Sequence, residues 1–85
     1  MNKYVNVNVS VPEEVLLSLR VDGDEFAYQM KILAAMKLFE QHKLSIGQSA
    51  AFAGMDKLSF IKILGQNKIS IFGSALDIEE DFHNA

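Results

Sequence analysis

The sequence predicts a small, mainly α-helical protein with an N-terminal ribbon strand, a helical core that contains a helix-turn-helix, a short C-terminal strand and an acidic tail. We expect it to form a dimer. Three observations support this fold class. Residues 45–66 carry the capping residues and apolar spacing of two short helices joined by a tight turn. Residues 24–41 repeat apolar side chains at helical spacing, and residues 4–11 alternate valine with polar or tyrosine side chains, which is the period of a strand.

The predicted helix-turn-helix begins with a capping box. Ser45 is followed three residues later by Gln48, so a helix should start near residue 46. Gly54 allows the backbone to reverse after this helix, and Asp56 can cap a second one. Helical spacing gives the two helices an inner face made of Ile46, Ala50, Ala53, Phe60, Ile63 and Leu64. Ala50 is small enough for the two helices to cross closely, as in a DNA-binding helix-turn-helix.

The outer face of the second predicted helix carries lysine, serine and glutamine with little acid. These side chains are Lys57, Ser59, Lys62 and Gln66, and they favour DNA as the partner. Ser49 stands where an apolar residue is commoner. The alternative is an ordinary helical hairpin whose alanines and glycine serve packing alone.

The length of the chain limits its organisation. With 85 residues, 49% of them hydrophobic, we expect one domain over residues 1–74 and a tail over residues 75–85. A chain this short buries only about 60–65% of the surface of its unfolded form, which favours a dimer. Cysteine is absent, so disulfides and thiolate metal sites are excluded and a cytoplasmic location is expected. No apolar segment reaches the roughly 20 residues that cross a bilayer, so we expect no membrane association.

The net charge of −3 is unevenly distributed along the chain. Residues 1–25 carry −3 and residues 77–85 carry −4, whereas six lysines against two carboxylates give residues 26–76 a charge of +4. The helix-turn-helix therefore lies in the only basic part of the chain. A solvated lysine surface without a partner is the alternative.

The N-terminal strand needs a partner, because a lone strand is not stable. Residues 4–11 should pair with their twin in a second subunit or with the alternating run at residues 68–71. Pro12, followed by two glutamates, then fits the start of a helix that ends before residue 22. The apolar stripe of this helix consists of Val15, Leu16 and Leu19.

The same order of strand, Pro-Glu-Glu and two helices also opens a ribbon-helix-helix protein, in which paired strands enter the DNA major groove. Asn6 and Asn8 would then touch base edges, since an asparagine amide can make two hydrogen bonds to adenine. The alternative is that both asparagines face solvent on a dimer ribbon.

The longest predicted helix covers residues 24–41 and has two apolar stripes, which is typical of a helix buried between neighbours. We expect it to be the central core element and part of a subunit interface. One stripe follows Phe26, Met30, Leu33 and Lys37, and the second consists of Ile32, Met36 and Phe39. His42 and Lys43 place positive charge at the negative end of this helix.

Catalytic and metal-binding patterns are weak. No carboxylate lies at helical ligand spacing from His42, and Glu79 and His83 would offer only two ligands. The chain contains neither a glycine-rich phosphate loop nor a nucleophile elbow. We therefore expect no cofactor, no metal and no enzymatic activity.

A known family shares much of this sequence. Residues 34–55, together with Ser59-Phe60, Lys68-Ile69 and the Pro-Glu-Glu opening, closely resemble a family of short prokaryotic proteins long labelled uncharacterised. Its members are regarded as antitoxins, often encoded beside PIN-domain ribonuclease toxins. His42 stands where that family often has glycine, and the region around Lys57 lacks an arginine frequently seen there.

The resemblance implies an antitoxin-like, DNA-binding transcriptional regulator that neutralises a partner ribonuclease. The residues expected to contact operator DNA are Gln48, near the phosphates at the first helix start, and Lys57, Ser59, Lys62 and Gln66. The acidic tail is expected to bind the toxin through Leu76, Ile78, Glu79, Glu80, Asp81 and Phe82. The competing interpretations are a protein-interaction or assembly module that never touches nucleic acid, a DNA reader that uses its ribbon, and a tail that is merely a solvated terminus.

Overall fold

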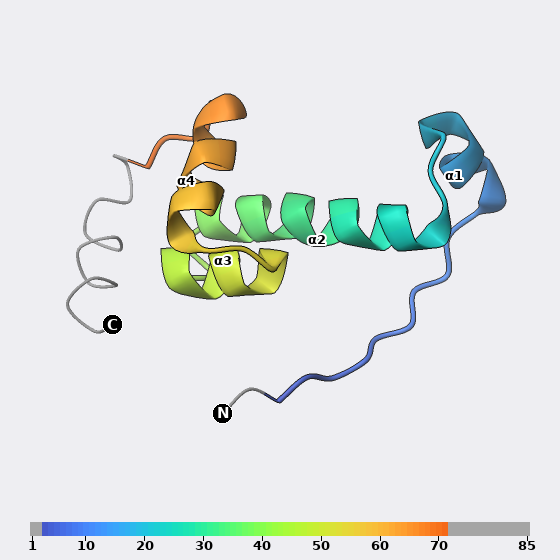
Figure 1. Cartoon of the computed structure of the whole chain (residues 1–85), viewed down its shortest axis with the longest axis horizontal. Coiled ribbons are helices and arrows are strands. Elements are labelled where there is room, and N and C mark those ends of the chain that lie inside the picture. The colour runs from blue at the N-terminus through green and yellow to red at the C-terminus, as the bar shows by residue number, and fades with distance from the viewer. Residues whose placement is uncertain (1–2, 72–85) are drawn as a thin grey trace.

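The computed structural model describes residues 3–71, which contain four α-helices: α1 (Glu13–Leu19), α2 (Gly23–Glu40), α3 (Ile46–Ala53) and α4 (Lys57–Gln66). Helix α2 is a long central rod, with α1 beside its N-terminal end and α3 and α4 packed at its C-terminal end (Figure 1). Residues 3–11 form an extended arm that leads into α1. The four predicted helices are confirmed, and each boundary lies within one or two residues of its expected place.

Three of the helices start at side-chain caps. The carboxylate of Asp22 accepts the Glu25 N–H at 2.8 Å, and that of Asp56 accepts the Ser59 N–H at 2.7 Å. The predicted capping box is also present, because Ser45 Oγ accepts the Gln48 N–H at 3.1 Å while Gln48 Oε1 accepts the Ser45 N–H at 2.9 Å. These bonds satisfy backbone donors that a helix start leaves without intrahelical partners.

Each of the four described helices is followed within two residues by a residue in the left-handed conformation, the geometry that turns the chain away from a helix. These residues are Arg20 (φ 59°), His42 (φ 62°), Gly54 (φ 78°) and Lys68 (φ 59°). After α3, the N–H of Met55 bonds to the Ala50 carbonyl at 3.0 Å and fixes the sharp turn into α4. Glycine is free of the steric penalty for this conformation, so Gly54 suits the tightest of these connections.

The hydrophobic core lies where α2, α3 and α4 meet. It is built from Ala35, Met36 and Phe39 of α2, Ile46, Ala50 and Ala53 of α3, and Phe60 and Leu64 of α4. The rings of Phe39 and Phe60 are fully buried and pack edge to face, with centroids 6.3 Å apart and an interplanar angle of 87°. This geometry is favourable for aromatic pairs. The expected inner face of the helix-turn-helix is confirmed, with Ile63 partly buried at its margin.

The other half of the described chain is poorly covered. Helix α1 has no fully buried residue, and Leu19 of its predicted stripe is 51% exposed. The central-core expectation for α2 holds only for its C-terminal half, because Tyr28 and Leu33 are 55% and 60% exposed. Eight of the ten large hydrophobic side chains exposed within residues 3–71 lie on the arm, α1 and α2: Tyr4, Val5, Val7, Val9, Leu17, Leu19, Tyr28 and Leu33.

The two predicted strands are absent from the described residues. Residues 4–11 are extended but are not part of a sheet, since the described residues of the chain include no second strand with which they could pair (Figure 1). The C-terminal run fails as a strand for a different reason. Lys68 takes the left-handed conformation that ends α4, the Ile69 N–H bonds to the Leu64 carbonyl at 2.9 Å, and the Ile69 side chain packs against the core.

Ser49 is fully buried in α3, where the sequence pattern favours an apolar residue. Its hydroxyl has no hydrogen-bond partner among the residues that the structure describes. A buried polar group without a partner loses its hydration and gains nothing in return.

We predict that Ser49→Ala raises the free energy of unfolding by about 1–2 kcal/mol, because it removes this hydroxyl and favours the helix. Urea denaturation followed by circular dichroism measures the change. Ser18→Ala is the matched control: Ser18 is an exposed helical serine, so it shares only the helix-propensity gain of at most about 0.5 kcal/mol. Equal effects of the two substitutions would contradict this interpretation.

Candidate nucleic-acid interface

Helix α4 is anchored on one side and open on the other. Phe60 and Leu64, one turn apart, are fully buried and fix the rotation of the helix about its axis. We call the opposite side the outer face of α4; its exposed residues are Leu58, Ser59, Lys62, Gly65 and Gln66. The outer face therefore contains three of the predicted DNA-contacting residues, Ser59, Lys62 and Gln66.

The other two predicted contact residues differ from these three. Lys57 is half-buried on the flank of α4. Gln48 is exposed at the start of α3, but its side-chain oxygen already accepts the Ser45 N–H in the capping box. An amide can still donate through its nitrogen while its oxygen accepts, so Gln48 suits a phosphate contact made by the Nε2 group. The predicted toxin-contacting residues, 76–82, lie outside the described residues.

Asp56 is the carboxylate nearest to this interface in sequence, and its cap fixes the first turn of α4. The Ser59 backbone N–H, and secondly the Ser59 hydroxyl, donate to the carboxylate and hold the pKa of Asp56 below its ordinary value of 3.8. A serine hydroxyl carries lone pairs that accept hydrogen bonds as well as one donor proton, so Ser59 suits both the amino groups of cytosine or adenine and a phosphate oxygen.

The sequence pattern did not identify two residues of the outer face, Leu58 and Gly65, as functional. Leu58 is 78% exposed, although leucine is a core-forming residue type. Gly65 lies within α4, where glycine is less favourable than alanine, and no atom of residues 3–71 outside the adjoining residues and the backbone of α4 lies within 4 Å of the place that a Cβ would take. The spacing could have identified Leu58, because it places this residue on the side opposite Phe60 and Leu64.

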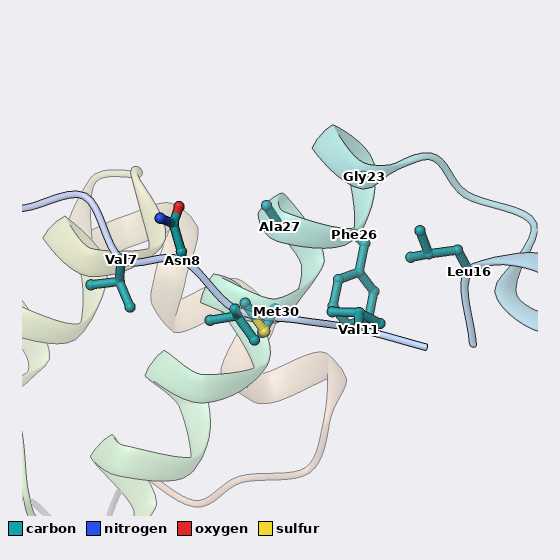
Figure 2. A pocket seen from close by; sticks show the side chains of 9 residues that line it. Val7, Asn8, Val11, Leu16, Gly23, Phe26, Ala27 and Met30 are labelled. Carbon is teal, nitrogen blue, oxygen red and sulfur yellow. The ribbon is translucent and has the colours of Figure 1, made fainter. Parts of the chain in front are cut away.

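A second concave surface lies at the other end of the molecule. Valines of the arm, Leu16 of α1, and Phe26 and Met30 of α2 line a groove of about 420 Å³ (Figure 2). Asn8 also borders it, and both Asn6 and Asn8 are exposed on the arm. The groove is lined mainly by apolar side chains, which suits protein packing better than contact with a polyanion.

Residues 3–71 contain no group of three or more His, Cys, Asp or Glu side chains that could hold a metal ion. None of the helices described in this part of the chain has both the length and the apolar character needed to cross a membrane.

Comparison with known proteins places the chain in a family. The model of an uncharacterised protein family, UPF0175, matches residues 1–85. The chain belongs to UPF0175. A relative named UPF0175 protein, from Aeropyrum pernix, is 31% identical to this UPF0175 protein over 77 residues, which cover 91% of the present chain and 82% of the relative. No solved structure matches the chain. The expected membership of an uncharacterised family is thus confirmed.

The Asp56 cap predicts a specific pH dependence. A carboxylate whose pKa is lower in the folded state stabilises the fold above its unfolded pKa, and this stabilisation disappears as the pH falls through the folded value. We expect Asp56→Asn to keep a capping oxygen but to remove this titration. The stability difference between wild type and variant should therefore shrink as the pH falls from about 6 to below 3, as measured by urea denaturation at each pH.

The matched control is Asp24→Asn, which removes an exposed carboxylate from the first turn of α2 without touching the cap at Asp22. An Asp56→Asn stability difference that stays constant across the pH range would show that the cap does not titrate with folding.

Proposed function

We propose that this UPF0175 protein is an antitoxin-like, DNA-binding transcriptional regulator that binds its operator through the outer face of α4. One observation carries the proposal. The core that anchors Phe60 and Leu64 leaves Ser59, Lys62 and Gln66 uncovered on the opposite side of a capped helix. If the chain itself had covered this side, DNA recognition by α4 would have been impossible.

The chemistry of these side chains suits the DNA major groove. The groove is about 12 Å wide and admits an α-helix. A glutamine amide such as that of Gln66 can make two hydrogen bonds to adenine, and a lysine such as Lys62 can bind phosphate or the acceptor edge of guanine. The positive charge of residues 26–76 supports attraction to a polyanion.

A homodimer is part of the proposal, because paired recognition helices read half-sites about 34–36 Å apart. The support comes from the uncovered apolar side chains of the arm, α1 and α2. Val5 and Val7 are 80% and 77% exposed, although alternation places them on the valine face of the arm. Pairing of two arms as a ribbon would give each strand a partner and bring the valine faces onto the grooves formed with α2.

The antitoxin component rests on the family resemblance and on charge. Residues 77–85 carry −4, which complements the basic groove with which a ribonuclease binds RNA. Leu76, Ile78 and Phe82 are spaced among these acids and provide apolar anchorage. The competing function is a protein-interaction module without nucleic-acid binding, and it predicts no affinity for DNA upstream of the gene.

The test of DNA binding is fluorescence anisotropy with the DNA upstream of the protein's own gene. We expect Lys62→Ala to weaken binding. The slope of log affinity against log salt concentration should fall by about one unit for each subunit whose Lys62 ammonium group contacts a phosphate. Lys31→Ala is the matched control, because Lys31 is an exposed lysine on α2 and its loss changes the net charge equally.

Absence of wild-type binding would end the regulator proposal and favour the interaction module. The double substitution Asn6→Ala and Asn8→Ala separates the two modes of reading. Loss of recognition in this variant, with little effect of Lys62→Ala, would move the DNA contact from α4 to the ribbon.

Dimer formation has its own test. We predict that Val7→Asp converts the protein to a monomer in light-scattering measurements of molecular mass, because an unpaired carboxylate buried between subunits costs several kcal/mol. Asn6→Asp places the same charge on the opposite face of the arm. It should leave the dimer intact, since facing charges on an exposed ribbon cost at most about 1 kcal/mol. Equal masses for both variants would contradict the valine-face interface.

A further inference from the structure

The exposed side chain of Leu58 is not explained by the fold. Leu58 is the second residue of α4 and is 78% exposed, the highest value among the large hydrophobic side chains of residues 45–66. The other exposed one is Phe52 of α3, at 39%. Leu58 projects on the side away from Phe60 and Leu64, so it adds nothing to the core that holds α4 in place.

The surroundings of Leu58 are polar. Ser59 follows it, and Lys62 lies one turn further along the same side of the helix. An isolated leucine beside a lysine is not the contiguous apolar patch that marks a protein-binding surface. The positive charge next to Leu58 instead complements a negatively charged partner.

Gly65 gives a second indication that a partner approaches this side closely. It lies seven residues after Leu58, two turns along the same line of the helix. Since no other segment of residues 3–71 comes within 4 Å of its missing Cβ, packing within the described part of the chain does not require glycine there. The outer face thus combines a projecting leucine with a position that lacks a side chain.

We propose that Leu58 is a specificity-determining residue that recognises thymine through its 5-methyl group in the major groove. This inference rests on the proposed function, because it assigns a base contact to the same face of α4. Residues near the N-terminus of a recognition helix reach base edges. The thymine methyl is the one apolar group in the base-pair pattern of the major groove, and leucine has no donor or acceptor with which to read the polar groups.

The experiment compares two forms of the DNA upstream of the gene, amplified with either thymidine or deoxyuridine triphosphate. When its primers are also synthesised with deoxyuridine in place of thymidine, the second form lacks every thymine methyl but keeps the same base pairs and hydrogen-bonding groups. We expect the wild-type protein to bind uracil DNA about fourfold more weakly for each methyl that Leu58 covers, and about fifteenfold more weakly when a symmetric dimer covers two.

Leu58→Ala should bind thymine DNA more weakly than the wild type does and should lose most of its preference for thymine over uracil DNA. Phe52→Ala is the matched control, because it truncates the other exposed large hydrophobic side chain of residues 45–66, which lies on α3 outside the proposed dimer surface, and it should keep the wild-type preference. Leu58→Met retains an apolar side chain and should keep part of the preference for thymine over uracil DNA. The ratio of preferences between wild type and Leu58→Ala isolates this contact from any other thymine contact and from changes in DNA shape.

An equal thymine preference in the wild type and Leu58→Ala would overturn the inference while leaving DNA binding intact. Failure of the wild type to bind either DNA would instead overturn the proposed function. Because Leu58 is exposed, its truncation should leave the helical circular dichroism and the unfolding midpoint nearly unchanged, so a loss of preference would not arise from unfolding.

Discussion

The edge-to-face contact between Phe39 of α2 and Phe60 of α4 is the interaction on which the rest of the structure depends. It joins the end of the long helix to the second helix of the helix-turn-helix. Both rings are fully buried, and truncating such a phenylalanine to alanine typically costs about 3–5 kcal/mol. For a chain of 85 residues this is a large part of the total stability. The same contact fixes which side of α4 faces outward.

The described chain divides into a covered and an uncovered half because one small core cannot reach both ends of α2. This helix has 18 residues and spans about 27 Å, whereas α3 and α4 have 8 and 10 residues and cover only its C-terminal end. The arm and α1 add a groove at the other end but bury no side chain of α1 fully. An exposed apolar surface of this kind is typical of protein–protein contacts, and a second copy of the chain is the partner that we propose.

The helix-turn-helix could be predicted from sequence almost completely, because its signals are local. The capping box at Ser45, the turn at Gly54 and the cap at Asp56 each involve residues three or four positions apart. The strands could not be predicted reliably, because alternation specifies which face a side chain takes but does not supply a pairing partner. At Lys68 the end of α4 overrode the alternating pattern, since its backbone bonds fix a left-handed residue there.

The outer face of α4 needed both kinds of information. The sequence alone determined that Ser59, Lys62 and Gln66 share one side of a helix, because helical periodicity follows from backbone geometry. Only the tertiary structure decided that this side is uncovered, that Leu58 belongs to it, and that the buried Ser49 hydroxyl lacks a partner within residues 3–71. The reason is physical: local hydrogen bonds and periodicity are encoded in neighbouring residues, whereas burial depends on contacts between segments that are distant in the chain.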